Sequence, residues 1–271
     1  MTDDENKTLK MVRAAIEKNA DELKELAANI HKNPELGFKE EKACEWQMKL
    51  LKKHGFDAQN PVAGLNTAYR ATHGKGRPAF CFVAEYDALP EMGHACGHNL
   101  ICGAAIGAGL ALGKVMGARR IPGSVVVLGT PAEESLGGKV VMVRKGAFKG
   151  VDAVLEAHPS ARTGPDTGST AIRRLDVAFE GRAAHAAGAP EQGRNALDAV
   201  MLLFAGVNAW RQHLVETDRI HGIVDNGGVV PNIVPARASC VFFLRSLDDH
   251  ELAHMIERFR DALPGGREAW K

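Results

Sequence analysis

The alternation of short apolar segments with helical ones is the feature that most restricts the fold of this chain of 271 residues. Residues 78–85 and 124–129 are short, apolar and rich in strand-forming side chains, which is typical of buried strands. The Gly-rich stretch 97–117 predicts a helix packed closely on a sheet. A second helix is expected at 138–145 and a short strand at 153–157. This order predicts an α/β layer with right-handed crossovers between parallel strands.

Helices are expected before this layer. Apolar residues recur at spacings of three, four and seven over 9–30, which predicts one helix that the Asn-Pro pair at 33–34 ends. Another helix, with Trp46 on its apolar face, is expected to end at 54–55. Residues 66–71 predict an edge strand.

The pattern changes after 162–169, a stretch rich in Gly, Pro, Thr and Ser that indicates a linker. The elements expected after it are a strand at 171–179, a helix at 196–214, strands at 220–230 and 236–245, and a helix from about 248. This β-α-β-β-α order resembles a split βαβ unit without its final strand. The length and this change of pattern together predict two domains.

Composition excludes several functions. With 34 Lys and Arg against 33 Asp and Glu, the net charge of +1 gives no field to attract nucleic acid or an anionic membrane, so we expect neither as partner. The apolar stretch 99–113 is Gly-rich and too short to span a bilayer, and the polar N-terminus does not resemble a signal peptide. Five scattered cysteines favour reduced thiols in the cytoplasm over a disulfide framework.

Cys96 and His98 form the densest group of potential metal ligands, in the segment GHACGHN just before the Gly-rich helix. Thiolate and imidazole bind zinc and related ions. On this segment alone, a metal site and buried structural residues remain alternatives.

Glu133 and Glu134 follow the strand predicted at 124–129. Active sites of open α/β sheets form at the carboxyl ends of strands, where one carboxylate can bind a metal while its neighbour holds a water. The alternative is a pair of carboxylates favoured by a helix N-terminus.

His158 follows a third predicted strand. A lone histidine there is more often structural, but parallel strands bring their carboxyl ends side by side. The side chains expected to converge are Cys96, His98, Glu133, Glu134 and His158. Beyond the linker, His185 lies among small residues that leave its ring accessible, and Asn232 lies in the segment PNIVP. A loop histidine without a role is the alternative for His185.

Several motifs together resemble the M20 family of metallopeptidases and amidohydrolases, in its subfamily D. They appear in the family's order at 31–38 (HKNPELGF), 84–90 (AEYDALP), 93–100 (GHACGHNL), 129–134 (GTPAEE), 137–139 (GGK), 157–160 (AHPS), 181–187 (GRAAHAA), 193–196 (GRNA) and 232–235 (NIVP). The resemblance implies an α/β catalytic domain with a mixed, largely parallel sheet flanked by helices, and an inserted α+β lid that carries a homodimer contact. Residues 1–168 would be the N-terminal part of the catalytic domain and 169–271 the lid.

The resemblance also implies a metal-dependent hydrolysis of amide bonds in small dipeptides or N-acyl or N-aroyl amino acids. The implied ligands of one or two Zn or Mn ions are Cys96, His98, Glu134 and His158. Glu133 would be the general base, and Asp87 would orient the site. His185 would stabilise the oxyanion in the partner's active site. Asn232 and Arg245 would hold the substrate by its carboxylate.

Two departures from the family pattern matter. Many relatives carry His-x-Asp where this chain has Glu85-Tyr86-Asp87, so the Cys96 and His98 pair replaces that histidine. Family members also continue beyond residue 271 with another lid strand and a last histidine ligand, and 264–271 does not have the composition of a strand. We therefore expect a C-terminally truncated chain with weak or no hydrolase activity.

Two other functions remain open. One is a non-catalytic product that keeps a metal-binding core and a dimerisation lid. The other is a hydrolase with Cys96 as nucleophile and His98 as base, which leaves the two adjacent glutamates without a role.

Overall fold

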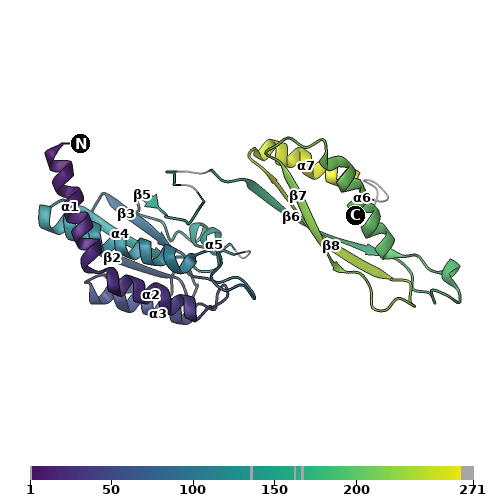
Figure 1. Ribbon diagram of the computed structural model, residues 1–271, viewed down its shortest axis with the longest axis horizontal. Coiled ribbons are helices and arrows are strands. Elements are labelled where there is room, and N and C mark those ends of the chain that lie inside the picture. Colours follow the sequence, from purple (N-terminus) through teal and green to yellow (C-terminus); the bar gives the residue numbers. More distant parts are fainter. Residues whose placement is uncertain (1, 135–136, 162, 166–167, 264–271) are drawn as a thin grey trace. The chain divides into compact units, whose positions relative to one another are not determined.

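The structure is a computed structural model that describes residues 2–134, 137–161, 163–165 and 168–263. It divides into two compact units, Met1–Thr163 and Gly164–Lys271, each with its own hydrophobic core (Figure 1). The division falls between residues 163 and 164, whereas the sequence suggested 168 and 169. Part of the expected linker, residues 162, 166 and 167, lies outside the described residues.

The first unit is built on a five-stranded mixed sheet. Its strands, in spatial order, are β1 (Asp57–Gln59), β2 (Tyr69–Lys75), β4 (Gly123–Gly129), β3 (Ala79–Ala84) and β5 (Ala153–Leu155). Strand β3 runs parallel to both β4 and β5, as expected, whereas β2 is antiparallel to β1 and β4. The strand expected at 66–71 begins later, at Tyr69, and it is not an edge strand because β1 pairs with it on its outer side. Strand β1 was not expected, because its three residues are too few to show a strand period in the sequence.

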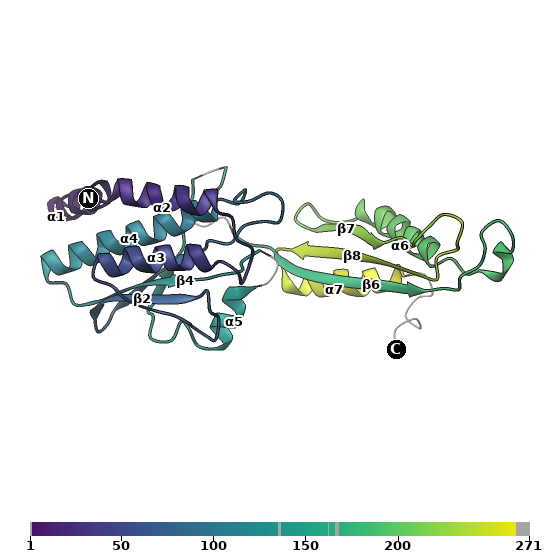
Figure 2. The same cartoon turned by 90° about the horizontal axis from the view of Figure 1, so that it is seen from below.

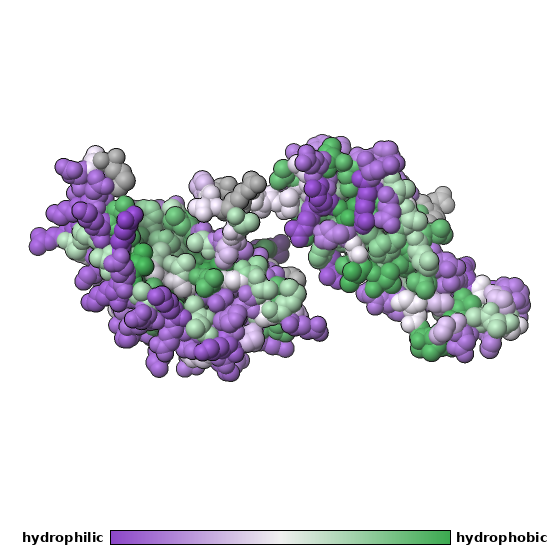
Figure 3. All heavy atoms as spheres, viewed as in Figure 1, coloured by the Kyte–Doolittle hydropathy of each residue, from purple (hydrophilic) through white to green (hydrophobic). Residues whose placement is uncertain are grey.

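Helices cover both faces of this sheet (Figure 2). On one face, α4 (His98–Arg119) packs on β3 and β4, and α3 (Glu41–Lys53) packs on β1 and β2. The helices α1 (Asp3–Lys18) and α2 (Ala20–Lys32) pack on α4, and the outward surface of α1 is hydrophilic (Figure 3). The short α5 (Gly138–Arg144) lies on the opposite face, where Met142 joins a smaller core.

The single helix expected over 9–30 is in fact two helices, which meet at Asn19. The backbone of Asn19 has φ −104° and ψ 6°, its side chain donates to the carbonyl of Ala15 at 2.8 Å, and its N–H donates to the carbonyl of Ile16. Asparagine ends helices in this way because its amide competes for local backbone groups.

Helix α4, expected at 97–117, extends beyond the apolar stretch 99–113 that was judged too short to span a bilayer. It has 22 residues and a mean hydropathy of 1.7, so by length and composition alone it could cross a membrane. However, 67% of its most apolar stretch is buried inside the protein. A Cβ atom on Gly109 would lie 2.6 Å from a methyl carbon of Val127, so this helix packs directly on the sheet as the core of its unit.

The second unit has the expected β-α-β-β-α order. Its elements are β6 (Ala171–Glu180), a 3-10 turn (Pro190–Gln192), α6 (Ala196–Arg211), β7 (Arg219–Asn226), β8 (Arg237–Ser246) and α7 (Asp249–Asp261). The antiparallel sheet has the order β6-β8-β7, and both helices pack on it. Alternate residues of β8 are buried in the core that the two helices cover. Residues 264–271, for which no strand was expected, lie outside the described residues.

Candidate metal centre

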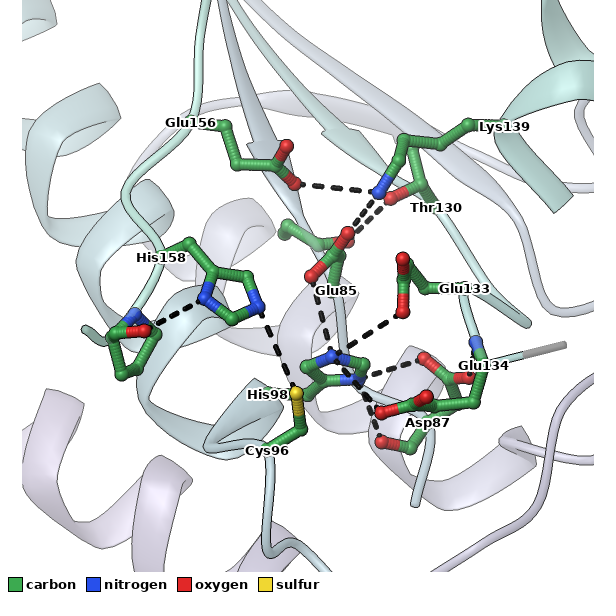
Figure 4. A network of polar contacts seen from close by, with 12 residues as sticks. Glu85, Asp87, Cys96, His98, Thr130, Glu133, Glu134, Lys139, Glu156 and His158 are labelled. Atoms are coloured by element: carbon green, nitrogen blue, oxygen red, sulfur yellow. Dashed lines mark hydrogen bonds and ion pairs between the residues drawn. The ribbon is translucent and has the colours of Figure 1, made fainter. Parts of the chain in front are cut away.

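The polar residues of the first unit gather at one edge of its sheet, where three parallel strands end (Figure 4). Glu85 and Asp87 follow β3, Glu133 and Glu134 follow β4, Glu156 and His158 follow β5, and Cys96 and His98 lie at the start of α4. Neighbouring parallel strands present their carboxyl ends at the same edge. The structure therefore brings together all five residues that were expected to converge.

Gly97 lets the turn before α4 approach the segment of His158. Its φ of 81° lies in the left-handed region, which side chains other than glycine rarely adopt. A Cβ atom there would lie 2.9 Å from the ring of Pro159. A glycine is therefore required between Cys96 and His98 for both backbone and packing reasons.

His98 is fully buried and its ring is fixed by Asp87. Its Nδ1 lies 2.9 Å from both Asp87 Oδ1 and the Asp87 carbonyl oxygen. Because a carbonyl can only accept, Nδ1 carries the proton and the neutral ring keeps a lone pair on Nε2. Nε2 is buried with no hydrogen-bond partner among the described residues, and lies 3.8 Å from Glu133 Oε2 and Glu134 Oε1.

His158 has the same tautomer. Its Nδ1 donates to the carbonyl of Pro159 at 2.9 Å, which leaves the lone pair on Nε2. This Nε2 lies 3.8 Å from Cys96 Sγ. An imidazole nitrogen and a thiol thus face each other beside the His98 ring, whose centroid is 6.1 Å from that of His158.

Asp87 links two parts of the site. While Oδ1 accepts from His98, Oδ2 accepts from the backbone N–H of Glu134 at 2.9 Å. Burial alone would raise the pKa of Asp87, but the hydrogen bonds from His98 and from backbone N–H groups outweigh it and hold the pKa below its usual value. An ionised Asp87 therefore orients both a ring and a carboxylate segment.

The charges of the site favour a cation. Burial and the neighbouring Glu134 raise the pKa of Glu133, and burial with the same carboxylate raises the pKa of Cys96 to about 11. Burial lowers the pKa of His98, but Asp87, Glu134 and Glu133 outweigh it and hold the pKa above its usual value. Each shift opposes further negative charge, so a positive ion placed among these groups is stabilised.

The donor atoms fit a divalent metal. Two groups of potential ligands, Cys96 with His98 and His158, and His98 with Glu133 and Glu134, each have their donor atoms within 4.8 Å of one another. Buried Nε2 of His98 and Oε1 of Glu134 have no hydrogen-bond partner among the described residues, which is costly unless an ion satisfies them. Thiolate, imidazole and carboxylate are ligands of zinc-type ions.

The segment of Glu133 and Glu134 is held by a residue that sequence reasoning missed. Glu40 is completely buried, and its Oε1 accepts from the N–H of Ala132 at 2.8 Å. Ala132 has a φ of 58°, in the left-handed region. No signal in the sequence connects Glu40 with this loop, because the two are 92 residues apart.

Sequence reasoning also missed Glu85, Lys139 and Glu156 as parts of the site (Figure 4). The Lys139 ammonium contacts Glu85 Oε1 and lies 3.5 Å from Glu156 Oε1. The other oxygen of Glu85 lies 3.4 Å from His98 Nε2. Glu85 could have been found, because it stands two residues before Asp87 at the end of the same strand.

In the second unit, the segments of His185 and Asn232 lie side by side. The N–H of Ala186 donates to the carbonyl of Asn232 at 3.0 Å, and His185 bridges to the next residue, Ile233. His185 Nδ1 accepts from the N–H of Gly188 at 3.0 Å, which places the proton of the neutral ring on Nε2. The ring is thus oriented as a hydrogen-bond donor at Nε2.

Arg245 is not beside these two residues in its own unit. It pairs with Ile172 and Arg219 near one end of β8, whereas the strand begins at Arg237, just after the Asn232 segment. Eight residues of strand separate these ends, a distance of roughly 26 Å. Its role in substrate binding stays a prediction.

Comparisons with known proteins fit this geometry. Residues 167–267 match the M20 family model described as a peptidase dimerisation domain. The chain is 37% identical over 263 residues to a mouse Xaa-Arg dipeptidase, covering 91% of this chain and 60% of the relative. The chain belongs to the M20 family. This M20 chain is also 35% identical over 263 residues to a p-aminobenzoyl-glutamate hydrolase polypeptide of Escherichia coli, covering 90% of this chain and 55% of that protein.

Solved structures share the fold. A Bacillus subtilis YXEP protein, described as a dinuclear metal binding peptidase from the M20 family, superposes with a TM-score of 0.66 at 20% identity, covering 93% of this chain and 70% of that one. An aminobenzoyl-glutamate utilization protein from Klebsiella pneumoniae gives the same TM-score at 24% identity, covering 94% and 74%. The M20 chain spans 55–60% of the length of the curated relatives named above.

Proposed function

We propose that this M20 chain carries a metal-dependent centre for the hydrolysis of amide bonds. The observation that carries the proposal is the meeting of a thiol, two imidazole Nε2 atoms and adjacent carboxylates where three parallel strands end. The metal ligands are Cys96, His98, Glu134 and His158. The relatives are named for a dipeptide and for an aroyl amino acid, so the proposed substrates are small dipeptides or N-acyl or N-aroyl amino acids.

The proposed metal is one or two ions of Zn or Mn. Such an ion supplies Lewis-acid polarisation of the amide carbonyl and lowers the pKa of water towards about 7. The residues of the chain contribute negative ligands that offset its charge and, through Asp87, a fixed ring orientation at His98.

Glu133 is the proposed general base. Its side chain is 39% exposed, so water and substrate reach it, whereas the other nearby carboxylate, Glu134, is 21% exposed. Burial and Glu134 raise the pKa of Glu133, which suits a group that accepts a proton and releases it again. Glu133 takes a proton from the attacking water and delivers it to the leaving amine.

The second unit supplies the remaining proposed groups. His185 donates from Nε2 to the developing oxyanion in the active site of a second subunit, an effect typically worth roughly 3–4 kcal/mol. Asn232 and Arg245 hold the substrate carboxylate. The match to a peptidase dimerisation domain supports a homodimer through this unit. All five cysteines are free, which supports a reducing compartment, the cytoplasm.

The test is a turnover assay of the purified chain loaded with Zn or Mn, using dipeptides and N-acyl amino acids. The matched variants are Glu133→Gln and Glu45→Gln, the latter an exposed glutamate of α3. The proposal predicts that Glu133→Gln keeps its metal and loses turnover, whereas Glu45→Gln keeps both.

Other outcomes contradict the proposal. Metal binding without any turnover in the unchanged chain supports the non-catalytic alternative. Turnover that persists in a chelator supports Cys96 as nucleophile. The same assay measures the level of activity, which the sequence analysis expects to be weak or absent.

A further inference from the structure

Glu85 is a buried carboxylate at the metal centre, and its two oxygens differ in their contacts. It follows β3 directly and is 2% exposed. Its Oε1 accepts from the ammonium of Lys139. Its Oε2 is buried, has no hydrogen-bond partner among the described residues, and lies 3.4 Å from His98 Nε2 (Figure 4).

Two potential ligand atoms therefore face each other. When the ring of His98 is neutral, its proton lies on Nδ1, and Nε2 presents a lone pair to the Glu85 oxygen. Two buried acceptors in contact are costly unless a proton or a metal ion lies between them. Two atoms that bind one zinc ion at about 2.0–2.1 Å with tetrahedral angles lie about 3.4 Å apart. The separation observed here is that of two ligands of one ion.

We propose that Glu85 is an additional metal ligand, through Oε2, and that Lys139 is the residue that positions it. The inference rests on the proposed metal centre and adds a carboxylate to its ligands. Glu85 and His98 bind the same ion, through Oε2 and Nε2.

Lys139 determines which oxygen of Glu85 is available. It lies in the first turn of α5, and its ammonium contacts both Glu85 Oε1 and Glu156 Oε1. With Oε1 occupied, Glu85 offers a single oxygen to an ion. The lysine charge also offsets the negative charge that an additional buried carboxylate brings.

The experiment is a titration of the metal-free chain with Zn or Mn against a chromophoric chelator, which reports affinity without any assay of activity. The test variants are Glu85→Gln, Lys139→Met and the double variant. The matched controls are Glu45→Gln and Lys49→Met, exposed residues of α3. Thermal melting of the metal-free variants checks that each is folded.

Glu85→Gln is expected to lower metal affinity at least about tenfold, because a neutral amide is a weak ligand. The NH₂ group of the glutamine can also donate a hydrogen bond to His98 Nε2 and so compete with the metal for its lone pair. Lys139→Met is expected to lower the affinity less, since the carboxylate remains. The double variant is expected to bind as weakly as Glu85→Gln, and the controls as the unchanged chain.

Two results would overturn the inference alone: an affinity of Glu85→Gln within twofold of the unchanged chain, or recovery of full affinity in the double variant. Recovery would show that Glu85 serves only to neutralise Lys139. If the unchanged chain binds no metal, the proposed function fails as well. The double variant also keeps the test decisive if Glu85→Gln, in which Lys139 loses one of its two carboxylate partners, does not fold.

Discussion

Asp87 Oδ1 lies 2.9 Å from His98 Nδ1, and both side chains are fully buried. The same aspartate accepts from the N–H of Glu134, so one carboxylate fixes a ring on α4 and the segment after β4. Orientation of metal-binding imidazoles by a carboxylate at the other ring nitrogen raises their basicity and fixes their tautomer.

Removal of this contact should weaken metal binding without removing a ligand. Asp87→Ala is expected to lower metal affinity by about 10–100-fold. Asp87→Asn should be milder, because its amide oxygen still accepts from His98 Nδ1. Competition with a chelator measures both. Equal affinities for Asp87→Ala and the unchanged chain would contradict the orienting role.

Gly97→Ala should destabilise the chain and disturb the Cys96 turn. The left-handed backbone costs alanine about 1–2 kcal/mol, and the contact of 2.9 Å with the rigid Pro159 ring adds to it. Gly55→Ala is the matched control, since Gly55 has the same φ of 81° and a Cβ there meets no atom within 4 Å among the described residues. Urea unfolding should show a larger loss for Gly97→Ala, and only that variant should lose metal affinity. Equal losses would rule out the Pro159 contact.

Thiol modification should distinguish Cys96 from the other cysteines. Burial raises the pKa of Cys44 and of Cys102 to about 12, and that of Cys81 and of Cys240 to about 11. These four thiols are buried and should react with iodoacetamide only after unfolding. Cys96 is partly exposed and should react slowly in the metal-free chain and less in the loaded one. Mass spectrometry of peptides locates the label, and labelling of Cys44 in the native chain would contradict the packing described.

Glu40 should make stability depend on pH. Burial raises its pKa, although hydrogen bonds from backbone N–H groups, including Ala132, partly offset this. The folded chain then holds the proton more tightly than the unfolded one, so stability from this group is present at low pH and is lost as pH rises from about 4.3, the usual glutamate value, through the folded pKa.

Glu40→Gln removes this titration and keeps an acceptor for Ala132. Its stability relative to the unchanged chain should therefore increase as pH rises across this window. Urea unfolding of both proteins at several pH values measures the difference. A decrease with rising pH would show that the pKa of Glu40 is lowered instead.

The sequence predicted the site better than it predicted the limits of the elements. Three apolar strands, each followed by polar residues, were enough to bring Cys96, Glu133 and His158 together, because parallel strands align their ends. The split at Asn19 was missed because the apolar period continues through it, and β1 was missed because three residues show no period.

The contacts of the site that the sequence did not predict join residues far apart in the chain. Glu40 holds Ala132 across 92 residues, and Lys139 meets Glu85 across 54. Neither contact follows from spacing along the chain. Nor does the placement of Arg245, which depends on the register of β8 with its neighbours.

The central claim is that Cys96 and its neighbours bind a divalent metal while Glu133 acts on the substrate. Titration of the metal-free chain with Co²⁺, followed by the absorption of the thiolate–cobalt bond, tests it most directly. We predict a saturable band in the unchanged chain and in Glu133→Gln, and its loss in Cys96→Ser. A chain that gives no band, or a band that survives in Cys96→Ser, would contradict the proposed centre.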